Sequence, residues 1–204
     1  MGQYYKATFL DKNADVTAND WNPIKFQLSP YDFNNGAKLM EHSWVDNSYV
    51  QAVEYLLSKD KEGTRFVWSG DYAENFNGLE CNLYDFGDDD ACREGLSQLF
   101  KDGVVQFHTE QGWSEEWCEL KNPKTYKYIL NHSKKLYVVI PKQNEHYTVI
   151  HPLPLLTCES NGLGGGDYFA EKDAELVGAW KYDTISVGDE IPSGFKKLKV
   201  NFKE

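Results

Sequence analysis

Apolar and polar residues alternate over several short stretches of this chain, a pattern typical of strands that bury one face. The clearest case is a predicted β-hairpin, in which residues 126–130 and 136–140 are strong strand formers on either side of a polar turn at 131–135. Further strands or extended segments are predicted at residues 4–10, 24–28, 38–44, 64–68, 104–107, 147–150, 151–156, 175–180, 184–187 and 195–202. The chain is therefore expected to be mostly β-structure.

Helical spacing of apolar residues interrupts the strands at two or three places. Residues 48–62 predict the first helix, because Ser48 and Gln51 fit a capping box and apolar side chains recur at helical intervals behind them. A second helix is expected to start at the acidic residues 88–90, whose carboxylates suit a helix N-terminus. A short third helix is predicted over residues 113–120.

The order of these elements lacks the regular strand–helix alternation of a parallel sheet. No linker-like or low-complexity segment divides the 204 residues, and this length suits one sizeable core rather than two domains. Residues 1–204 are therefore predicted to form a single α+β domain, with a largely antiparallel sheet and two or three short helices.

The densest glycine run, Asn-Gly-Leu-Gly-Gly-Gly-Asp-Tyr at residues 161–168, is the first candidate site. Its backbone N–H groups could form an anion-binding nest, but it lacks the Gly-Lys-Ser/Thr ending of a P-loop and the helix that follows a dinucleotide fingerprint. An aspartate would also repel a phosphate. A tight loop that uses positive φ angles is the favoured interpretation. The candidate ligand-binding residues here are Gly162, Gly164, Gly165, Gly166, Asp167 and Tyr168.

Four residues outside the run are further candidates. His42, between a glutamate and a serine, could be a general base or a hydrogen-bonded histidine at a strand end. Asp71 lies in a Gly-Asp-Tyr triplet that recurs at Asp167. Trp44 and Trp68 could stack on a ligand or pack in the core. A nucleotide or sugar site built from these residues requires the three weak catalytic candidates, His42, Asp71 and Asp167, to share one pocket.

Charge and composition narrow the partners. The chain has a formal net charge of -11 and is rich in aromatic residues, with 13 Tyr, 11 Phe and 6 Trp. The negative charge argues against nucleic acid and against an anionic membrane, because both are bound through lysine and arginine. It suits a basic protein partner, or it serves solubility alone. A protein partner is therefore expected, and a small molecule remains possible.

No metal or cofactor is predicted. The four cysteines form no C-x-x-C pair, the histidines lack ligand spacing, and the aspartates at 85–90 do not follow the EF-hand order. The first residues lack an apolar signal segment, and no apolar run approaches the roughly 18 residues of a membrane span. A cytoplasmic location with reduced thiols is the simplest expectation.

Several segments together resemble an uncharacterised family of small bacterial and phage proteins. They are the start Met-Gly-Gln-Tyr-Tyr-Lys (1–6), Lys-Leu-Met-Glu-His-Ser-Trp (38–44), Trp-Ser-Gly-Asp-Tyr-Ala (68–73), and Leu-Asn-His-Ser-Lys-Lys (130–135) with the glycine run at 161–168. The resemblance spans most of the chain and implies a bacterial or phage origin and one architecture, but no activity. Similar proteins often carry arginine where this chain has Leu163, so the resemblance does not favour anion binding.

Two functions follow as hypotheses. The first is a soluble, non-enzymatic binding protein that acts on a protein partner through an acidic, aromatic-rich surface, as a toxin-immunity or counter-defence protein does. The alternative is a protein that binds or hydrolyses a nucleotide or sugar derivative near the Gly162–Tyr168 loop and His42. The sequence leaves open whether the protein is an enzyme.

Overall fold

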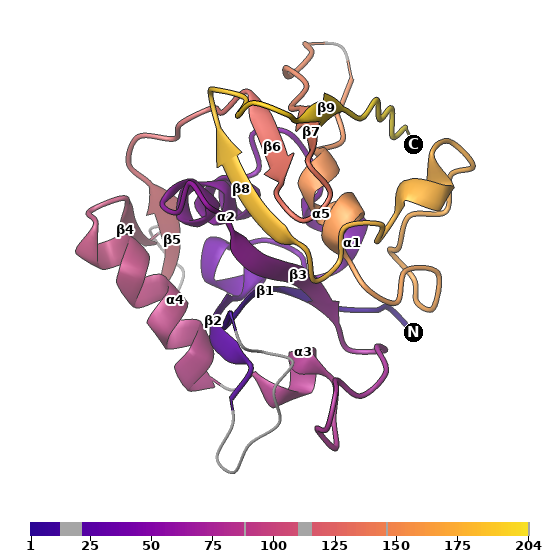
Figure 1. Ribbon diagram of the computed structural model, residues 1–204. Coiled ribbons are helices and arrows are strands. Elements are labelled where there is room, and N and C mark those ends of the chain that lie inside the picture. Colours follow the sequence, from indigo (N-terminus) through magenta and orange to yellow (C-terminus); the bar gives the residue numbers. More distant parts are fainter. Residues whose placement is uncertain (13–21, 88, 110–115, 146, 204) are drawn as a thin grey trace.

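A seven-stranded sheet forms the centre of the computed structural model, which describes residues 1–12, 22–87, 89–109, 116–145 and 147–203 (Figure 1). All its neighbouring strands pair antiparallel except the last two, which are parallel. In spatial order the strands are β2 (Ile24–Leu28), β1 (Tyr5–Leu10), β3 (Thr64–Gly70), β8 (Thr184–Gly188), β6 (Tyr128–Asn131), β7 (Leu136–Val139) and β9 (Lys196–Lys197). The predicted α+β class with a largely antiparallel sheet is confirmed.

A separate two-stranded sheet and the helices surround the main sheet. The small sheet pairs β4 (Val105–Thr109) with β5 (Glu116–Leu120). The helices of the described residues are α1 (Leu39–His42), α2 (Ser48–Ser58), α3 (Leu83–Phe86), α4 (Asp89–Lys101), α5 (Pro152–Thr157) and the 3-10 turns η1 (Pro30–Phe33) and η2 (Ala174–Leu176). In the described parts of the chain, no helix is long and apolar enough to cross a membrane.

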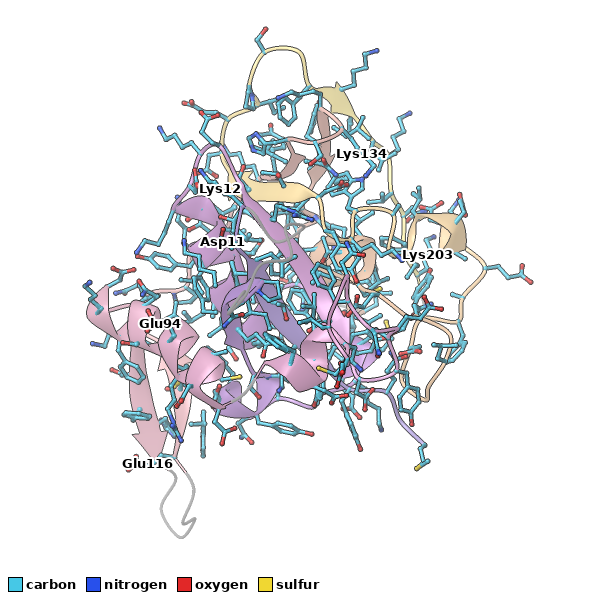
Figure 2. All side chains as sticks on the ribbon, turned by 60° about the horizontal axis from the view of Figure 1, so that its bottom comes forward. Asp11, Lys12, Glu94, Glu116, Lys134 and Lys203 are labelled. Atoms are coloured by element: carbon cyan, nitrogen blue, oxygen red, sulfur yellow. The ribbon has the colours of Figure 1, made fainter. Side chains whose placement is uncertain are left out.

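The two long helices follow the predicted patterns. In α2 the buried residues recur at helical spacing as predicted, but the capping box predicted at Ser48 and Gln51 is wrong. Ser48 is the first residue of the helix, and the N-cap is Asn47, whose Oδ1 accepts the backbone N–H of Val50 at 3.1 Å. The acidic first turn of α4 begins at Asp89. Figure 2 shows Glu94 on the outward side of α4, which packs across β2 with its apolar side. Both helices therefore cover the sheet with one apolar stripe each.

The core lies on both faces of β3 because side chains alternate along a strand. Trp68 is fully buried among aromatic rings on one face, and its ring centroid lies 5.4 Å from that of Tyr49 on α2. The Tyr49 hydroxyl accepts the Ala7 N–H at 2.8 Å and donates to the Leu28 carbonyl at 2.9 Å, which ties α2 to β1 and β2. On the other face, Val67 packs in a smaller cluster beneath α3.

Several predicted strands are wrong. Residues 38–44 contain helix α1, in which the Glu41 carboxylate caps the Lys38 N–H at 3.1 Å. Residues 151–156 were expected to be extended, but they form most of α5, because a proline at the first helical position lacks an N–H that would be unpaired there anyway. Residues 175–180 contain part of η2 instead of a strand. The local pattern of apolar residues could not distinguish helix from strand in these segments, because each helix is only one or two turns long.

In three other segments, the strand pairing in the structure differs from the prediction. Residues 113–120 are predicted to be a helix, yet Trp117 lies in β5 and pairs with His108. Leu120, three positions further on, therefore faces the opposite side of this strand. Trp113, at the start of that prediction, lies outside the described residues. Of the strand predicted at 147–150, Ile150 forms an isolated bridge with Trp44, and the strand predicted at 195–202 is reduced to the two residues of β9.

Candidate functional site

The glycine-rich loop does bind an anion, and that anion is the carboxylate of Asp167. Its Oδ2 atom accepts the backbone N–H groups of Gly162, Leu163 and Gly164 at 2.8, 3.1 and 3.0 Å. Its Oδ1 atom accepts the Tyr5 hydroxyl at 2.8 Å. Asp167 is 4% exposed. The nest suspected from the sequence is therefore filled by a side chain of the same loop, and no phosphate can enter it.

The N-terminal residues run along this loop and explain its small side chains. Gly2 forms a parallel bridge with Gly165, and the Gly165 N–H donates to the Met1 carbonyl at 3.0 Å. A Cβ on Gly164 would lie 2.5 Å from the backbone nitrogen of Gln3, which is closer than real side chains approach. The glycine run thus serves the close contact between two backbone segments.

His42 is a structural side chain in the core. Its Nε2 accepts the indole N–H of Trp68 at 2.8 Å, and its Nδ1 donates to the Gly36 carbonyl at 3.0 Å. Complete burial lowers the pKa of His42 to about 4, so the ring is neutral. With both nitrogens engaged and no exposed surface, His42 is not positioned to act as a general base.

Asp71 extends the pairing of β1 and β3 by one residue. Its N–H donates to the Tyr4 carbonyl and its Oδ1 accepts the Tyr4 N–H, both at 3.0 Å. Partial burial raises the pKa of Asp71, and the neighbouring carboxylates Asp85 and Asp167 raise it further, against the lowering effect of the Tyr4 N–H. The carboxylates of Asp71 and Asp167 are therefore close enough for the charge of Asp167 to affect the pKa of Asp71.

Trp44 lies apart from this group, in a shallow hollow with Asp46 and Gln143. Trp68 reaches His42, as described, and lies two positions before Gly70, which faces Tyr5 across the β1–β3 ladder. The predicted site residues other than Trp44 are thus gathered around one seam between β1, β3 and the glycine loop. Because His42 and Asp167 are buried, the seam is a packed interior and not an open pocket.

An exposed patch of tyrosines and carboxylates lies beside the seam. Tyr31 on η1 is 61% exposed. Partial burial raises its pKa, and the nearby Tyr4, Glu41 and Asp71 raise it further. Residues from η1, α1 and the ends of β1 and β3 therefore lie near enough to one another to interact electrostatically.

Helix α3 completes this patch. Burial raises the pKa of Tyr84 to about 12, and Tyr31, Asp71 and Asp85 add to the shift. Burial is the main cause of both pKa shifts, and the neighbouring acidic groups add to it because they disfavour further negative charge. The patch is called the tyrosine face below and consists of Tyr4, Tyr31, Tyr84, Glu41, Asp71 and Asp85.

Two lysines border the tyrosine face, and each is engaged within the chain. The Lys6 ammonium donates to the carbonyls of Tyr84 and Gly87 at 3.3 and 3.2 Å, and lies 4.4 Å from the centre of the Tyr84 ring. Lys38 forms an ion pair with Glu41 at 3.0 Å. The carboxylates of Asp71 and Asp85 give the face its negative character.

Next to Tyr31, the carboxylate of Asp32 has an unused oxygen. Among the described residues, its Oδ2 is the buried side-chain oxygen without a hydrogen-bond partner. Burial raises the pKa of Asp32, and the charge of Asp89 raises it further, while a backbone N–H and Lys6 lower it. A buried carboxylate oxygen without a donor is costly when it is charged, which agrees with the raised pKa.

The sequence signals for this face were incomplete. Tyr31 follows a proline in a polar turn, a position that often lies at the surface, but the turn itself does not indicate which residues lie near it. Tyr84 and Asp85 lie in a four-residue helix that has no periodic pattern to find. Their meeting with Tyr4 depends on contacts far apart in sequence, which no local pattern contains.

Neither a search for metal-binding groups in the described residues nor comparison with other proteins adds a candidate site. Within the part of the chain that the structure describes, no three His, Cys, Asp or Glu side chains are grouped so as to hold a metal ion. All four cysteines are free thiols. Comparison with protein-family models gives no match, and comparisons with the curated proteins and with the solved structures give none either.

Proposed function

We propose that this protein binds a partner protein with a basic surface, and that the tyrosine face makes the contact. The observation that carries the proposal is that the exposed Tyr31 and the half-buried Tyr84 lie within electrostatic range of each other and of the Asp71 carboxylate. Catalysis is not required for this function. We propose further that the protein acts in the cytoplasm and is of bacterial or phage origin, as an immunity or counter-defence protein would be.

The chemistry of the face suits such a partner. Tyrosine supplies a large, rigid and amphipathic contact area at a small cost in side-chain entropy. The carboxylates of Asp71 and Asp85 would pair with lysine or arginine, and a guanidinium can stack on the exposed ring of Tyr31. The net charge of -11 would steer a basic partner from a distance.

The small-molecule alternative at the Gly162–Tyr168 loop and His42 has less support. The nest of the loop already holds Asp167, and His42 is buried with both ring nitrogens bonded. A ligand would have to displace these internal hydrogen bonds and open the core. The exposed face needs no such rearrangement.

The test is affinity capture from a bacterial lysate with three versions of the chain. The wild type is compared with Tyr31→Ala and with the matched control Tyr147→Ala, because Tyr147 is 66% exposed and follows β7 rather than η1. We expect a protein with a basic surface that is retained by the wild type and the control, lost with Tyr31→Ala, and released by salt. Equal capture by both variants, or capture that salt does not weaken, would contradict the proposal.

A further inference from the structure

A cleft beside the turn that follows β3 is lined in part by a buried carboxyl group. The cleft has a volume of about 500 Å³, within the usual range for small-molecule sites. Its walls come from the start of β3, the turn that follows β3, the residues after α5 and the turn before β8. Leu163 of the glycine loop forms part of one wall and is 61% exposed.

The buried carboxyl is that of Glu159, which is 4% exposed and still contributes to the lining. Its Oε1 accepts the Gly70 N–H at 3.3 Å, and its Oε2 accepts the Tyr182 hydroxyl. Burial raises the pKa of Glu159 to about 7, against the lowering effects of the Tyr182 hydroxyl, the Gly70 N–H and Lys181. Near neutral pH, this carboxyl is able either to accept or to donate a hydrogen bond.

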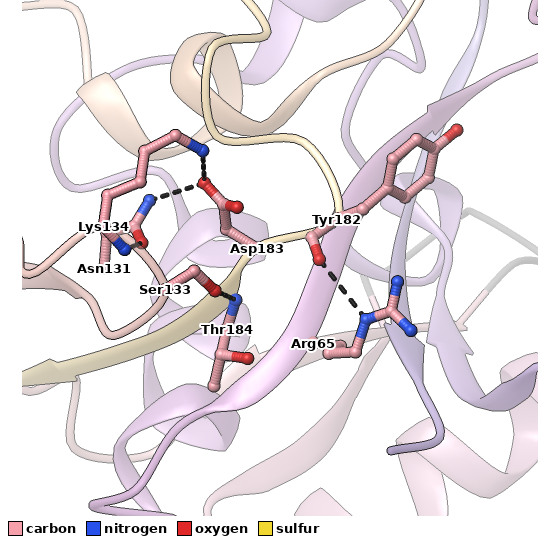
Figure 3. Close-up of polar contacts among 7 residues, drawn as sticks. All are labelled: Arg65, Asn131, Ser133, Lys134, Tyr182, Asp183 and Thr184. Atoms are coloured by element: carbon pink, nitrogen blue, oxygen red, sulfur yellow. Dashed lines mark hydrogen bonds and ion pairs between the residues drawn. The ribbon is translucent and has the colours of Figure 1, made fainter. Parts of the chain in front are cut away.

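The backbone of the cleft is held in an unusual conformation. Ser160 has φ 57° and Tyr182 has φ 65°, so two lining residues that are not glycine adopt the left-handed region. Figure 3 shows how Tyr182 is fixed, with the Arg65 Nε donating to its carbonyl at 3.4 Å while the phenol ring points away from that contact. Such conformations persist where the surroundings enforce them, and they are concentrated at binding sites.

The charges around the cleft are balanced. Lys181 and Arg65 contribute positive charge, Glu74 contributes negative charge, and Glu159 is partly ionised near pH 7. A strongly charged ligand of either sign would therefore meet repulsive as well as attractive side chains. Since the whole chain is acidic, a phosphorylated ligand would also be repelled at long range.

The remaining lining groups are suited to hydroxyl groups. The exposed amides of Asn75 and Asn77 each offer a donor and an acceptor, whereas the Ser160 hydroxyl already donates to the Glu159 carbonyl. Tyr72 is 36% exposed and presents a ring on which the C–H face of a sugar can pack. We propose that this cleft binds a small neutral sugar of one or two rings. This ligand site is separate from the tyrosine face and does not depend on the protein-binding proposal.

The test is a nuclear magnetic resonance titration of the full chain with glucose, N-acetylglucosamine and maltose at millimolar concentrations. We expect at least one of these sugars to shift the backbone amide signals of Tyr72, Asn77 and Leu163. Glucose 6-phosphate serves as the charged comparison and is expected to bind more weakly than glucose. No shift with any of the three sugars, or tighter binding of the phosphate ester, would overturn the proposal.

Variants separate the cleft from general effects on the fold. Asn77→Ala removes an exposed amide from the cleft, and Asn122→Ala removes an exposed amide elsewhere. We expect Asn77→Ala to weaken sugar binding about tenfold, the loss of one good hydrogen bond, and Asn122→Ala to leave it unchanged. Tyr31→Ala is expected to leave it unchanged too, so that the two proposals can fail separately. Equal affinities of the two asparagine variants would contradict the assignment of the cleft.

Discussion

The carboxylate of Asp167 accepts a hydrogen bond from the Tyr5 hydroxyl at 2.8 Å, although 162 positions separate the two residues in sequence. The same carboxylate accepts the N–H groups of Gly162, Leu163 and Gly164. One side chain thus closes its own loop and fastens it to the first strand of the sheet. This contact holds the seam next to which the tyrosine face and the Glu159 cleft lie.

Replacing this carboxylate should destabilise the fold. Asp167→Asn retains one acceptor oxygen but removes the charge and places an amide donor near three backbone donors. We expect the free energy of unfolding to fall by about 2–3 kcal/mol, the range for hydrogen bonds to a buried charged group. Urea denaturation measures it, with Asp189→Asn at an exposed ion pair as the control. Equal losses in the two variants would show that the loop does not depend on the Asp167 charge.

The close contact at Gly164 gives a second prediction. A methyl group there would meet the backbone of Gln3 at 2.5 Å, and one segment would have to move. We expect Gly164→Ala to destabilise the protein by about 2 kcal/mol, the typical cost of overpacking. Gly188→Ala is the matched control, because a Cβ at Gly188 meets nothing within 4 Å. Thermal unfolding of both variants tests this, and an unchanged midpoint for Gly164→Ala would contradict it.

The fold class could be predicted from the sequence, because long stretches carried a clear pattern. The hairpin is confirmed as β6 and β7, where strong strand formers flank a polar turn, and the first helix is confirmed as α2. The short helix α1 was missed because it is fixed by the burial of Leu39 and His42, which depends on the rest of the chain.

The candidate site was less predictable for the same reason. The sequence suggested that an aspartate in the glycine run would exclude a phosphate, but not that this carboxylate would itself fill the nest. The sequence does not single out Glu159, because nothing beside it in sequence shows that it is buried against Gly70 and Tyr182. Likewise, Tyr31 and Tyr84 lie 53 positions apart and meet only in the folded chain.

The buried His42 should make the free energy of unfolding fall at acidic pH. The folded pKa of His42 is about 4, below its ordinary 6.5, so the unfolded state binds the proton more tightly. The contribution of His42 is therefore full above pH 6.5 and is lost as the pH falls towards 4, by up to about 3 kcal/mol. His42→Gln should be less stable at neutral pH and should lack this component. Urea denaturation across pH 4–7 checks it; the same pH slope in variant and wild type would contradict it.

The contribution of Glu159 to stability should depend on pH in the opposite direction to that of His42. The folded pKa of Glu159 is about 7, above its ordinary 4.5, so the folded state binds the proton more tightly. Its contribution is full below pH 4.5 and is lost as the pH rises through 7. Glu159→Gln should therefore gain stability relative to the wild type as the pH rises, by about 2–3 kcal/mol at pH 8.

The measurement for this prediction is the difference in free energy of unfolding between Glu159→Gln and the wild type at pH 5 and pH 8. Glu74→Gln, an exposed carboxyl in the same cleft, serves as the control and should show little change with pH. A difference that stays the same between pH 5 and pH 8 would mean that Glu159 is ionised throughout that range, and would contradict the prediction.

Amide hydrogen exchange tests the tyrosine face most directly, with the chain measured alone and then saturated with the protein that it captures. We expect slower exchange on binding in η1 and α3, which carry Tyr31 and Tyr84, and unchanged exchange in β7 and the described residues that follow it. Slower exchange in β7 and its following residues, with none in η1 or α3, would contradict the assignment of the tyrosine face as the partner-binding surface.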